Sequence, residues 1–309
     1  MAPVARLLEG YRVGHASEFA RRTGCTVVLP PPGTIAAVDV RGGAPGTRET
    51  GVFAPGNLVS EIHGLLFTGG SAFGLAAASG VTSWLRARGV GFPVGPARVP
   101  IVAAAVLFDL AVGDPKAYPD EAMGIAACEQ AREDFEVGRI GAGTGATVGK
   151  VLGVSRASAG GVGACSVRLP GGQTVAALAA VNAFGDVVDP ETGRVLAGAD
   201  TGKGFVGSAR ALREDPLSES PPAAGQTTLV CVATDLRFDT GSLRRVAIEA
   251  HDGIARAIRP AHSVVDGDVV FALAPGGPTP PPLLRLRIGA AAAEATARAI
   301  VGAVERARE

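Results

Sequence analysis

The sequence predicts an α+β protein in which helices pack in layers on mixed β-sheets. Of its 309 residues, 47% are hydrophobic, which is ample for a large core. Apolar segments with strand-like patterns are interspersed with amphipathic helical segments in no strict alternation, so hairpins and helices mix along the chain. This order favours α+β layers over a doubly wound parallel sheet. The abundant glycines, 44 in number and without a fixed period, predict tight turns and close backbone contacts.

The first half of the chain supplies three strand or helix signals in succession. Residues 25–30 and 34–42 are rich in β-branched and apolar residues, as strands are. Residues 71–88 indicate a helix with Ser71 as its N-cap. Residues 65–85 carry no charge and are long enough to cross a membrane. Their Gly, Ser and Ala content favours a helix buried in a large soluble domain instead.

The following segments run from a short apolar strand to a glycine-rich stretch. Residues 101–110 predict a strand, and residues 120–135, after Pro119, predict a helix with a charged face. Residues 138–150 are too rich in glycine for regular structure and indicate backbone packed against another segment.

The second half repeats the pattern of strands followed by helices. Strands are expected at 163–169, 174–188, 227–234 and 268–274, and helices at 241–258 and 286–307. A turn is expected at 189–193, and residues 200–226 are expected to be a loop.

Composition removes several classes of function. The formal net charge is zero, with neither a basic run nor an acidic tail, so we expect no nucleic-acid and no membrane partner. The four cysteines, at 25, 128, 165 and 231, have no metal-like spacing with each other or with histidine, so no metal is expected. The N-terminus lacks the apolar segment of a signal peptide, which indicates a cytoplasmic protein.

Three short motifs resemble known sites but fail on inspection. Residues 141–146 form a relaxed dinucleotide fingerprint, yet they follow a helix and lack the acid that should come about twenty residues later. Residues 144–151 lack both the first glycine and the Ser or Thr of a phosphate loop. Ser71 lacks the second glycine of a nucleophile elbow. None of the four histidines has an evident triad partner in the sequence, although such a partner is defined in space.

A nucleophile that carries its own base would need no histidine. Thr227 opens an apolar strand directly after a linker-like stretch that ends at Gln226. If the chain were cut before Thr227, the freed α-amine, with an ordinary pKa of about 7.7–8.0, could take the hydroxyl proton. On this pattern alone, an ordinary strand-forming threonine is the stronger interpretation, because Thr is common in strands.

Six segments in order resemble the L-aminopeptidase/D-esterase family, which includes β-peptidyl aminopeptidases and the nylon-oligomer hydrolase. The similarity covers about residues 8–308. The segments are GGSAFGLAAASGV, FDL with AYPD, GAGTGATVGK, AVNAFGDVVDPETG, GQTTLVCVATD and HSVVDGD.

The resemblance implies a four-layer αββα sandwich of the self-processing N-terminal-nucleophile type, shared with ornithine acetyltransferases. It implies a single domain, 1–309, that cuts itself into 1–226 and 227–309, with the two fragments staying together. It further implies a homo-oligomer, tetrameric or larger, that acts on a small peptide, amide or ester without a cofactor or metal.

The resemblance also assigns roles to individual residues. Thr227 corresponds to the nucleophile, and Gln226–Thr227 to the cleavage site. Lys150 corresponds to a lysine whose charge would keep the Thr227 amine a free base. Asn182 corresponds to an asparagine that stabilises the oxyanion.

Three further residues complete the predicted site. Asp266 and Asp268 correspond to an acidic pair near the nucleophile, and residues i and i+2 of an extended segment face the same side. We therefore expect both to point at Thr227 and Lys150. Tyr118 corresponds to a tyrosine that lines the active site, where it would stabilise the oxyanion together with Asn182 or hold the substrate.

The sequence departs from the family pattern in two places. Gln226 stands before the cleavage site where relatives usually carry Asn or Gly, which bears on the rate of self-cleavage. Ala76 and Ser79 stand where many relatives carry acids. The main hypothesis is therefore a self-processing amide hydrolase of the aminopeptidase type. Two alternatives remain: an acyltransferase of the ornithine-acetyltransferase type, and an uncleaved binding or scaffold protein.

Overall fold

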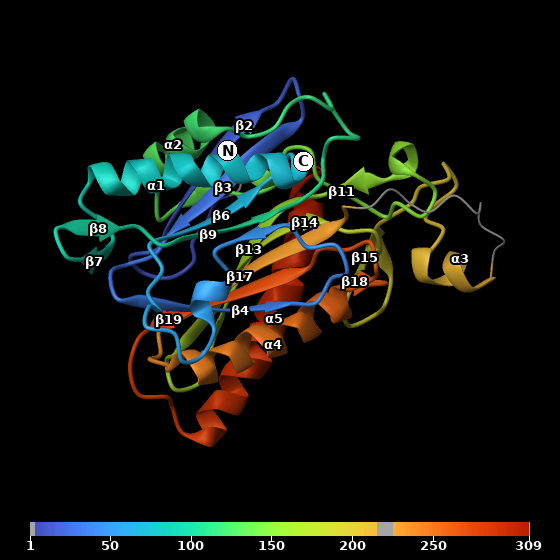
Figure 1. Ribbon diagram of the computed structural model, residues 1–309. Coiled ribbons are helices and arrows are strands. Elements are labelled where there is room, and N and C mark those ends of the chain that lie inside the picture. Colours follow the sequence, from blue (N-terminus) through green and yellow to red (C-terminus); the bar gives the residue numbers. More distant parts are fainter. Residues whose placement is uncertain (1–3, 215–224, 309) are drawn as a thin grey trace.

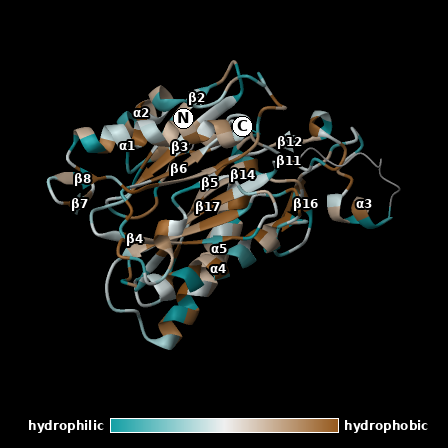
Figure 2. Cartoon of the chain, viewed as in Figure 1, coloured by the Kyte–Doolittle hydropathy of each residue, from teal (hydrophilic) through white to brown (hydrophobic). Residues whose placement is uncertain are grey.

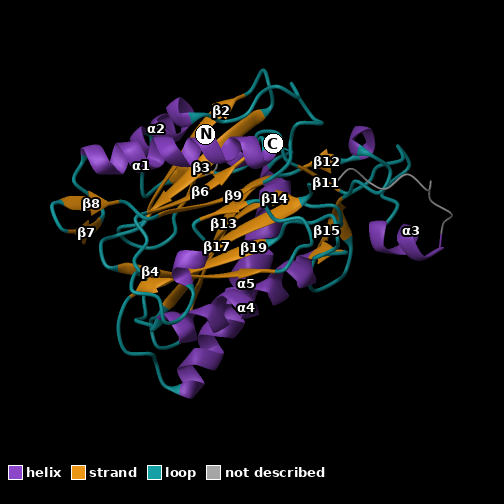
Figure 3. Ribbon diagram, viewed as in Figure 1, coloured by secondary structure: helices purple, strands orange, loops and turns teal. Residues whose placement is uncertain are grey.

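The computed structural model describes residues 4–214 and 225–308, and it has four layers, αββα (Figure 1). Two five-stranded sheets lie face to face, and a pair of helices covers the outer face of each sheet (Figure 3). Parallel and antiparallel pairings occur in both sheets. The predicted four-layer sandwich with mixed sheets is therefore confirmed.

The first sheet is built from the N-terminal part of the chain. Its strands, in spatial order, are β2 (Arg12–Glu18), β3 (Thr23–Leu29), β6 (Gly64–Thr68), β9 (Val102–Val106) and β5 (Thr47–Arg48). Its outer face is covered by α1 (Ala77–Ala87) and α2 (Glu121–Glu129).

The second sheet carries most of the C-terminal part. Its strands, in spatial order, are β13 (Gly161–Arg168), β14 (Thr174–Asn182), β17 (Thr227–Thr234), β19 (Val269–Pro275) and β4 (Thr34–Val40). Its outer face is covered by α4 (Thr240–Ala257) and α5 (Pro282–Arg306).

Several short strands form small sheets of their own beside the two five-stranded sheets. The paired short strands are β1 (Val4–Ala5) with β10 (Phe135–Glu136), β7 (Phe92–Val94) with β8 (Ala97–Val99), and β11 (Thr147–Val148) with β12 (Ser158–Ala159). A three-stranded sheet joins β16 (Val195–Ala197), β15 (Asp186–Val188) and β18 (Ile258–Arg259). One further helix, α3, spans Ser208–Glu214.

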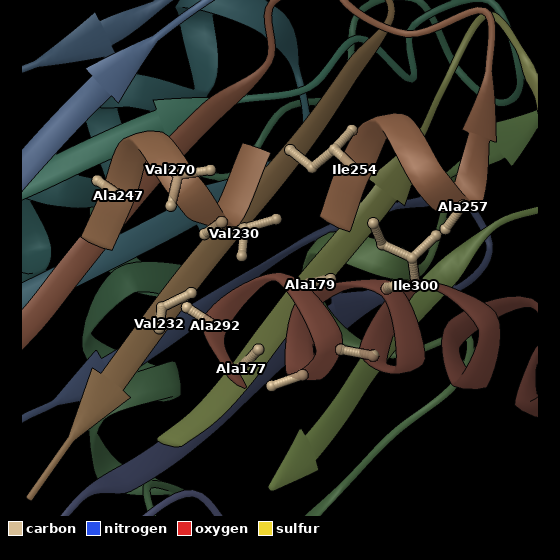
Figure 4. Close-up of a cluster of buried hydrophobic side chains, with 14 of the residues drawn as sticks. Ala177, Ala179, Val230, Val232, Ala247, Ile254, Ala257, Val270, Ala292 and Ile300 are labelled. Carbon is tan, nitrogen blue, oxygen red and sulfur yellow. The ribbon is translucent and has the colours of Figure 1, made fainter. Parts of the chain in front are cut away.

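Strand alternation produces the layered core. In β14, Ala177 and Ala179 pack on the side covered by α5, whereas Leu178 points the other way, into the space between the two sheets. Hydrophobic residues accordingly concentrate in the strands and on the inner sides of the helices (Figure 2). Figure 4 shows how small the side chains between the second sheet and its helices are, for example Ala177 beside Ala292. Such small residues let the helices approach the sheet closely.

Several predicted boundaries are wrong for identifiable reasons. The expected buried helix at 65–85 begins as strand β6, and helical structure starts only with a 3-10 turn at Ser71–Ala76. Ser71 is not an N-cap: Gly70 occupies that position, in a left-handed conformation, and Ser71 has a φ of 54°. The expected helix at 120–135 ends at Glu129, because Arg132 exchanges backbone hydrogen bonds with Val13 of the first sheet.

Other segments differ in extent. The expected strand 174–188 is interrupted after Asn182 and resumes as β15, and the expected loop at 200–226 contains α3. The remainder of that loop, 215–224, lies outside the described residues. Strands β2 and β6 escaped prediction. By contrast, β17 begins and ends where expected, and α4, β19 and α5 are shifted by a few residues. Among the described helices, none is both long and apolar enough to span a bilayer.

Gly163 lies where α5 presses on β13, and it yields a test of the packing. A Cβ atom at position 163 would lie 2.1 Å from the carbonyl oxygen of Ala299 and 2.5 Å from the amide of Ala303. We expect Gly163→Ala to lower the free energy of unfolding by about 2 kcal/mol, because overpacking forces the helix away from the sheet. Urea denaturation measures the change.

The matched control is Gly302→Ala, on the same helix, where an added Cβ meets no heavy atom within 4 Å. Alanine is the better helix former, so this variant should be at least as stable as the parent. Equal stability of the two variants would contradict the packing described.

Candidate active site

The predicted site residues come together, with one exception, where β17 enters the second sheet. Thr227 is the first residue of β17 and pairs with Asn182, the last residue of β14, while the segment before β19 runs alongside. The side chains that gather here are almost fully buried. They are Lys150, Asn182, Gln226, Thr227, Asp266 and Asp268.

Two hydrogen-bond donors contact the carbonyl oxygen of the peptide bond between Gln226 and Thr227. The Thr227 hydroxyl donates a hydrogen bond of 2.6 Å to the carbonyl oxygen of Gln226. The amide of Gly267 donates to the same oxygen at 2.5 Å. Two donors therefore polarise this carbonyl, and the Thr227 hydroxyl lies against the bond that precedes it.

Gly267 has no room for a side chain. A Cβ atom there would lie 2.8 Å from the Thr227 hydroxyl oxygen and 2.7 Å from the carbonyl oxygen of Ala44. The segment before β19 can thus approach Gln226 closely only because residue 267 is glycine. The amide of Ala44 in turn donates to the carbonyl oxygen of Asp266 at 2.8 Å, which fixes the segment from its other side.

Lys150 is a buried ammonium group surrounded by oxygen atoms. Its Nζ atom donates to the carbonyl oxygen and the Oδ1 atom of Asn182, both at 2.9 Å, and to Oε1 of Gln226. Burial lowers the pKa of Lys150 to about 7, although the negative charges of Asp266 and Asp109 oppose this shift. Lys150 therefore changes charge near neutral pH.

Asn182 connects three segments through its side-chain amide. Its Oδ1 atom accepts from Lys150 and from the amide of Thr147 at 3.0 Å. Its Nδ2 atom donates to the carbonyl oxygen of Phe108 at 2.9 Å. The amide of Phe108 donates to the carbonyl of Gly225 at 3.2 Å, so the residues before the predicted cut and Asn182 both contact Phe108.

The two acids lie beside the nucleophile, and their hydrogen bonds go to neighbouring backbone amides and side chains. Asp266 accepts from the backbone and hydroxyl of Ser263 and from the amide of Phe184. Asp268 accepts from the amide of Thr228 at 2.7 Å and from Nδ1 of His262 at 2.8 Å.

The carboxylates thus organise the backbone around Thr227 and are not hydrogen-bonded to its hydroxyl. Burial, and then the neighbouring charge of Asp268, raise the pKa of Asp266.

Tyr118 is the exception. Its side chain is 44% exposed, and its ring lies 5.6 Å from that of Phe73. It packs over Gly70, where a Cβ atom would lie 2.4 Å from Cβ of Tyr118. Tyr118 is therefore separate from the buried cluster and reaches it only indirectly, because the Gly70 amide donates to Asp109 at 2.7 Å.

Three residues near the cluster were missed as site residues, namely Asp109, His262 and Gly267. Asp109 is buried, which raises its pKa to about 6 in spite of the Gly70 amide, the Thr23 hydroxyl and the charge of Lys150. Asp109 and His262 both occur in segments that resemble the family, but one sequence gives no signal that they approach Lys150 and Asp268. In the described ranges, no group of three or more His, Cys, Asp and Glu side chains is arranged to hold a metal ion.

The buried lysine makes a testable contribution to stability. Lys150 releases its proton near pH 7 in the folded protein but near pH 10.5 in the unfolded chain. Between these values the unfolded state binds more protons, so the free energy of unfolding rises with pH by up to about 1.4 kcal/mol per pH unit.

We expect this rise in a Thr227→Ala protein and its loss when Lys150→Met is added, measured by urea denaturation from pH 7 to pH 10. The exposed Lys116→Met is the control for loss of a positive charge. If the free energy of unfolding changes with pH in the same way with and without Lys150, the lowered pKa of Lys150 is contradicted.

Comparison with known proteins identifies the family. Residues 8–309 match "Peptidase family S58". The chain is 42% identical to an "uncharacterized aminopeptidase" of Mycobacterium tuberculosis, covering 96% of this chain and 91% of the relative. It is 34% identical to the "6-aminohexanoate-oligomer endohydrolase" of Kocuria, covering 85% of this chain and 72% of that one.

A solved structure supports the same fold. The L-aminopeptidase D-Ala-esterase/amidase of Ochrobactrum anthropi, described as a variant of the Ntn-hydrolase fold, superposes with a TM-score of 0.73 at 20% identity. The match covers 97% of this chain and 85% of the other. This superposition shows the shared fold. The sequence matches place the chain in peptidase family S58, and it is a hydrolase.

Proposed function

We propose that the chain cuts itself between Gln226 and Thr227 and then uses Thr227 to hydrolyse small peptides, amino-acid amides or esters in the manner of an aminopeptidase. The observation that carries the proposal is the geometry at the Gln226 carbonyl, whose oxygen accepts from both the Thr227 hydroxyl and the Gly267 amide. The names of the relatives, an aminopeptidase and an oligomer endohydrolase, support hydrolysis of amide bonds over acyl transfer or a non-enzymatic role.

Self-cleavage would begin with attack of the Thr227 hydroxyl oxygen on the carbonyl carbon of Gln226. The Gly267 amide is placed to stabilise the negative charge that then develops on the carbonyl oxygen. The C–N bond breaks, the hydroxyl proton ends on the new α-amine, and an ester joins the two parts. Water then opens the ester to give fragments 1–226 and 227–309.

Cleavage would also vacate the binding site. Before the cut, the side-chain oxygen of Gln226 accepts a hydrogen bond from Lys150, and the carbonyl oxygen of Gly225 accepts one from the amide of Phe108. Once these residues leave, the Lys150 ammonium and the groups around Phe108 are available to a substrate. In this proposal, a substrate acyl group takes the place of the chain that precedes Thr227.

Turnover would use the freed amine as the base. Thr227 attacks the substrate carbonyl while its own α-amine takes the hydroxyl proton, and water releases the acyl group. A charged Lys150 nearby lowers the pKa of that amine and keeps it free. Gly267 and Asn182 would stabilise the oxyanion, and Tyr118 would hold the substrate. Asp266 and Asp268 would set the charge state of the site and hold the backbone around Thr227.

The proposal extends to how the two fragments associate and assemble. The fragments would stay together, because β17 and β19 from one lie between β14 and β4 from the other in a single sheet. We further propose a homo-oligomer, tetrameric or larger, located in the cytoplasm. The reaction as written uses no cofactor.

Intact mass under denaturing conditions tests self-cleavage. A cut before Thr227 divides the 309 residues and 30.9 kDa into pieces of 226 and 83 residues, about 23 and about 8 kDa. We expect both masses from the parent protein and a single 30.9 kDa species from Thr227→Ala. The control is Thr228→Val, since the Thr228 hydroxyl is buried and unpartnered within the described structure. Cleavage in Thr227→Ala would contradict the proposal.

Gly267 allows a second test of the same step. Gly267→Ala inserts a methyl group against the Thr227 hydroxyl and displaces the amide donor. We expect self-cleavage to slow by about 100-fold, since small misplacements of reacting groups cost this much. The time course of the two masses measures it.

Gly51→Ala, where an added Cβ meets no heavy atom within 4 Å, is the control. Thermal unfolding followed by circular dichroism verifies that the Gly267 variant is folded. A folded variant that cleaves at the parental rate would refute the role of the Gly267 amide.

A further inference from the structure

A cavity of about 290 Å³ lies beside the glycine-rich segment, and two arginines are among the residues that line it. It is lined by Phe19, Arg22, Arg139 and Thr144. Two of these four side chains are guanidinium groups and none is acidic. A pocket with this lining attracts anions.

Neither of the two arginines is paired with an acidic side chain in the part of the chain that the structure describes. Within residues 4–214 and 225–308, neither Arg22 nor Arg139 forms an ion pair, although Arg21 next in the chain contacts Asp114 at 3.6 Å. The Nε atom of Arg22 is buried and has no hydrogen-bond partner in this part of the structure. Partial burial of its guanidinium group, and then the positive charge of Arg22, lower the pKa of Arg139. Two cations that repel each other and a buried free donor cost free energy, and a bound anion would offset this cost.

The backbone holds Arg22 in a fixed position. Arg22 has a left-handed backbone, with a φ of 58°, a conformation that is costly for a residue with a side chain. Its carbonyl oxygen would lie 1.9 Å from a Cβ atom on Gly145, and its own Cβ 2.8 Å from one on Gly113. Two glycine-lined contacts therefore clamp the strained residue, so the direction in which its side chain leaves is set by the fold.

The segment that contributes Thr144 to the pocket is also held in a fixed conformation. The Thr144 hydroxyl donates to the carbonyl oxygen of Gly141 at 2.7 Å, and Ser17 accepts from the amide of Gly141 at 2.8 Å. These bonds fix the turn that follows Arg139 in the chain. The pocket is thus bounded by segments whose geometry does not depend on a ligand, which reduces the entropy cost of binding.

The cavity adjoins the candidate active site through shared segments. A Cβ on Gly145 would lie 2.8 Å from Cβ of Asp109, which acts electrostatically on Lys150. Thr144 lies just before Thr147, whose amide is bound by Asn182. A ligand in the cavity would therefore contact segments that also contribute residues to the Thr227 site.

We propose that Arg22 and Arg139 form a binding site for a small oxyanion, a carboxylate or a phosphate, next to the Thr227 site. Guanidinium groups match the paired oxygens of both anions and form charge-assisted hydrogen bonds with them. The oxyanion is either the free carboxylate of a short peptide substrate or a free phosphate that binds independently of turnover. Only the first source rests on the proposed function.

The first experiment measures binding without turnover. Inorganic phosphate and acetate are titrated by calorimetry into the parent protein and into Arg22→Gln, Arg139→Gln and Arg21→Gln. We expect the parent and Arg21→Gln to bind alike. Affinity should fall by about tenfold or more in the other two, since each loses a charge-assisted hydrogen bond. Arg139 is exposed, so its variant keeps the test valid even if Arg22→Gln fails to fold.

The second experiment distinguishes the two sources. KM is measured for a dipeptide with a free C-terminal carboxylate and for the same dipeptide as its amide. A rise of about tenfold for the acid alone, in Arg22→Gln and Arg139→Gln, assigns the site to the substrate carboxylate. Weakened phosphate binding with an unchanged ratio of the two KM values assigns it to a free oxyanion.

The proposal is overturned if phosphate and acetate bind all four proteins equally or not at all, while the acid-to-amide ratio of KM stays constant. If the protein hydrolyses neither dipeptide, the titration alone decides. Failure of the oxyanion site is then distinguishable from failure of the proposed hydrolase, which is tested by the masses of the fragments.

Discussion

The buried ammonium of Lys150 is the constraint around which the candidate site is organised. A cation removed from water is tolerated only if oxygen atoms replace its hydration shell. Here the replacements come from Asn182 at the end of β14 and from Gln226 before β17, with carboxylates of Asp266 and Asp109 nearby. One charge thus brings the glycine-rich segment, two strand ends and two acidic loops to a single point. Burial still dominates, so its pKa falls to about 7.

Close approach of backbones is the second requirement, and glycine meets it. At Gly267 the segment before β19 comes within hydrogen-bonding distance of the Gln226 carbonyl, and at Gly145 the glycine-rich segment meets the carbonyl of Arg22. Both contacts leave no space for a Cβ atom. The high glycine content therefore serves to let main chains from distant parts of the sequence touch, where their amides can act as donors.

The precursor, in the proposed function, fills its own active site. Gln226 accepts a hydrogen bond from Lys150, and Gly225 accepts one from the amide of Phe108. The carbonyl of Phe108 in turn accepts one from the side chain of Asn182. The interactions that stabilise the uncut chain are the ones that a substrate would later replace. Gln226 has a specific place in this scheme, because its side-chain oxygen reaches Lys150, which a glycine at that position could not do. Asp268, bound to Thr228 and His262, holds the start of β17.

Local patterns explain what the sequence predicts well and where it fails. The apolar run from Thr227 to Thr234 and the amphipathic α4 are found as predicted, because propensity and hydrophobic period act within a segment. Boundaries moved where a distant residue intervened, as when Val13 paired with Arg132 and ended α2 early. The family resemblance correctly indicated the αββα layers, and its site residues lie together apart from the exposed Tyr118.

The sequence alone therefore determined most of the longer strands and helices, the membership of a hydrolase family, and Thr227 as the residue to examine. Only the tertiary structure decided which groups meet there. It placed the Gly267 amide on the Gln226 carbonyl, paired Asp268 with His262, and brought Arg22 and Arg139 into the lining of one cavity. The physical reason is that such contacts join residues far apart in the chain, and no local period or propensity encodes which distant partners will meet when the layers pack.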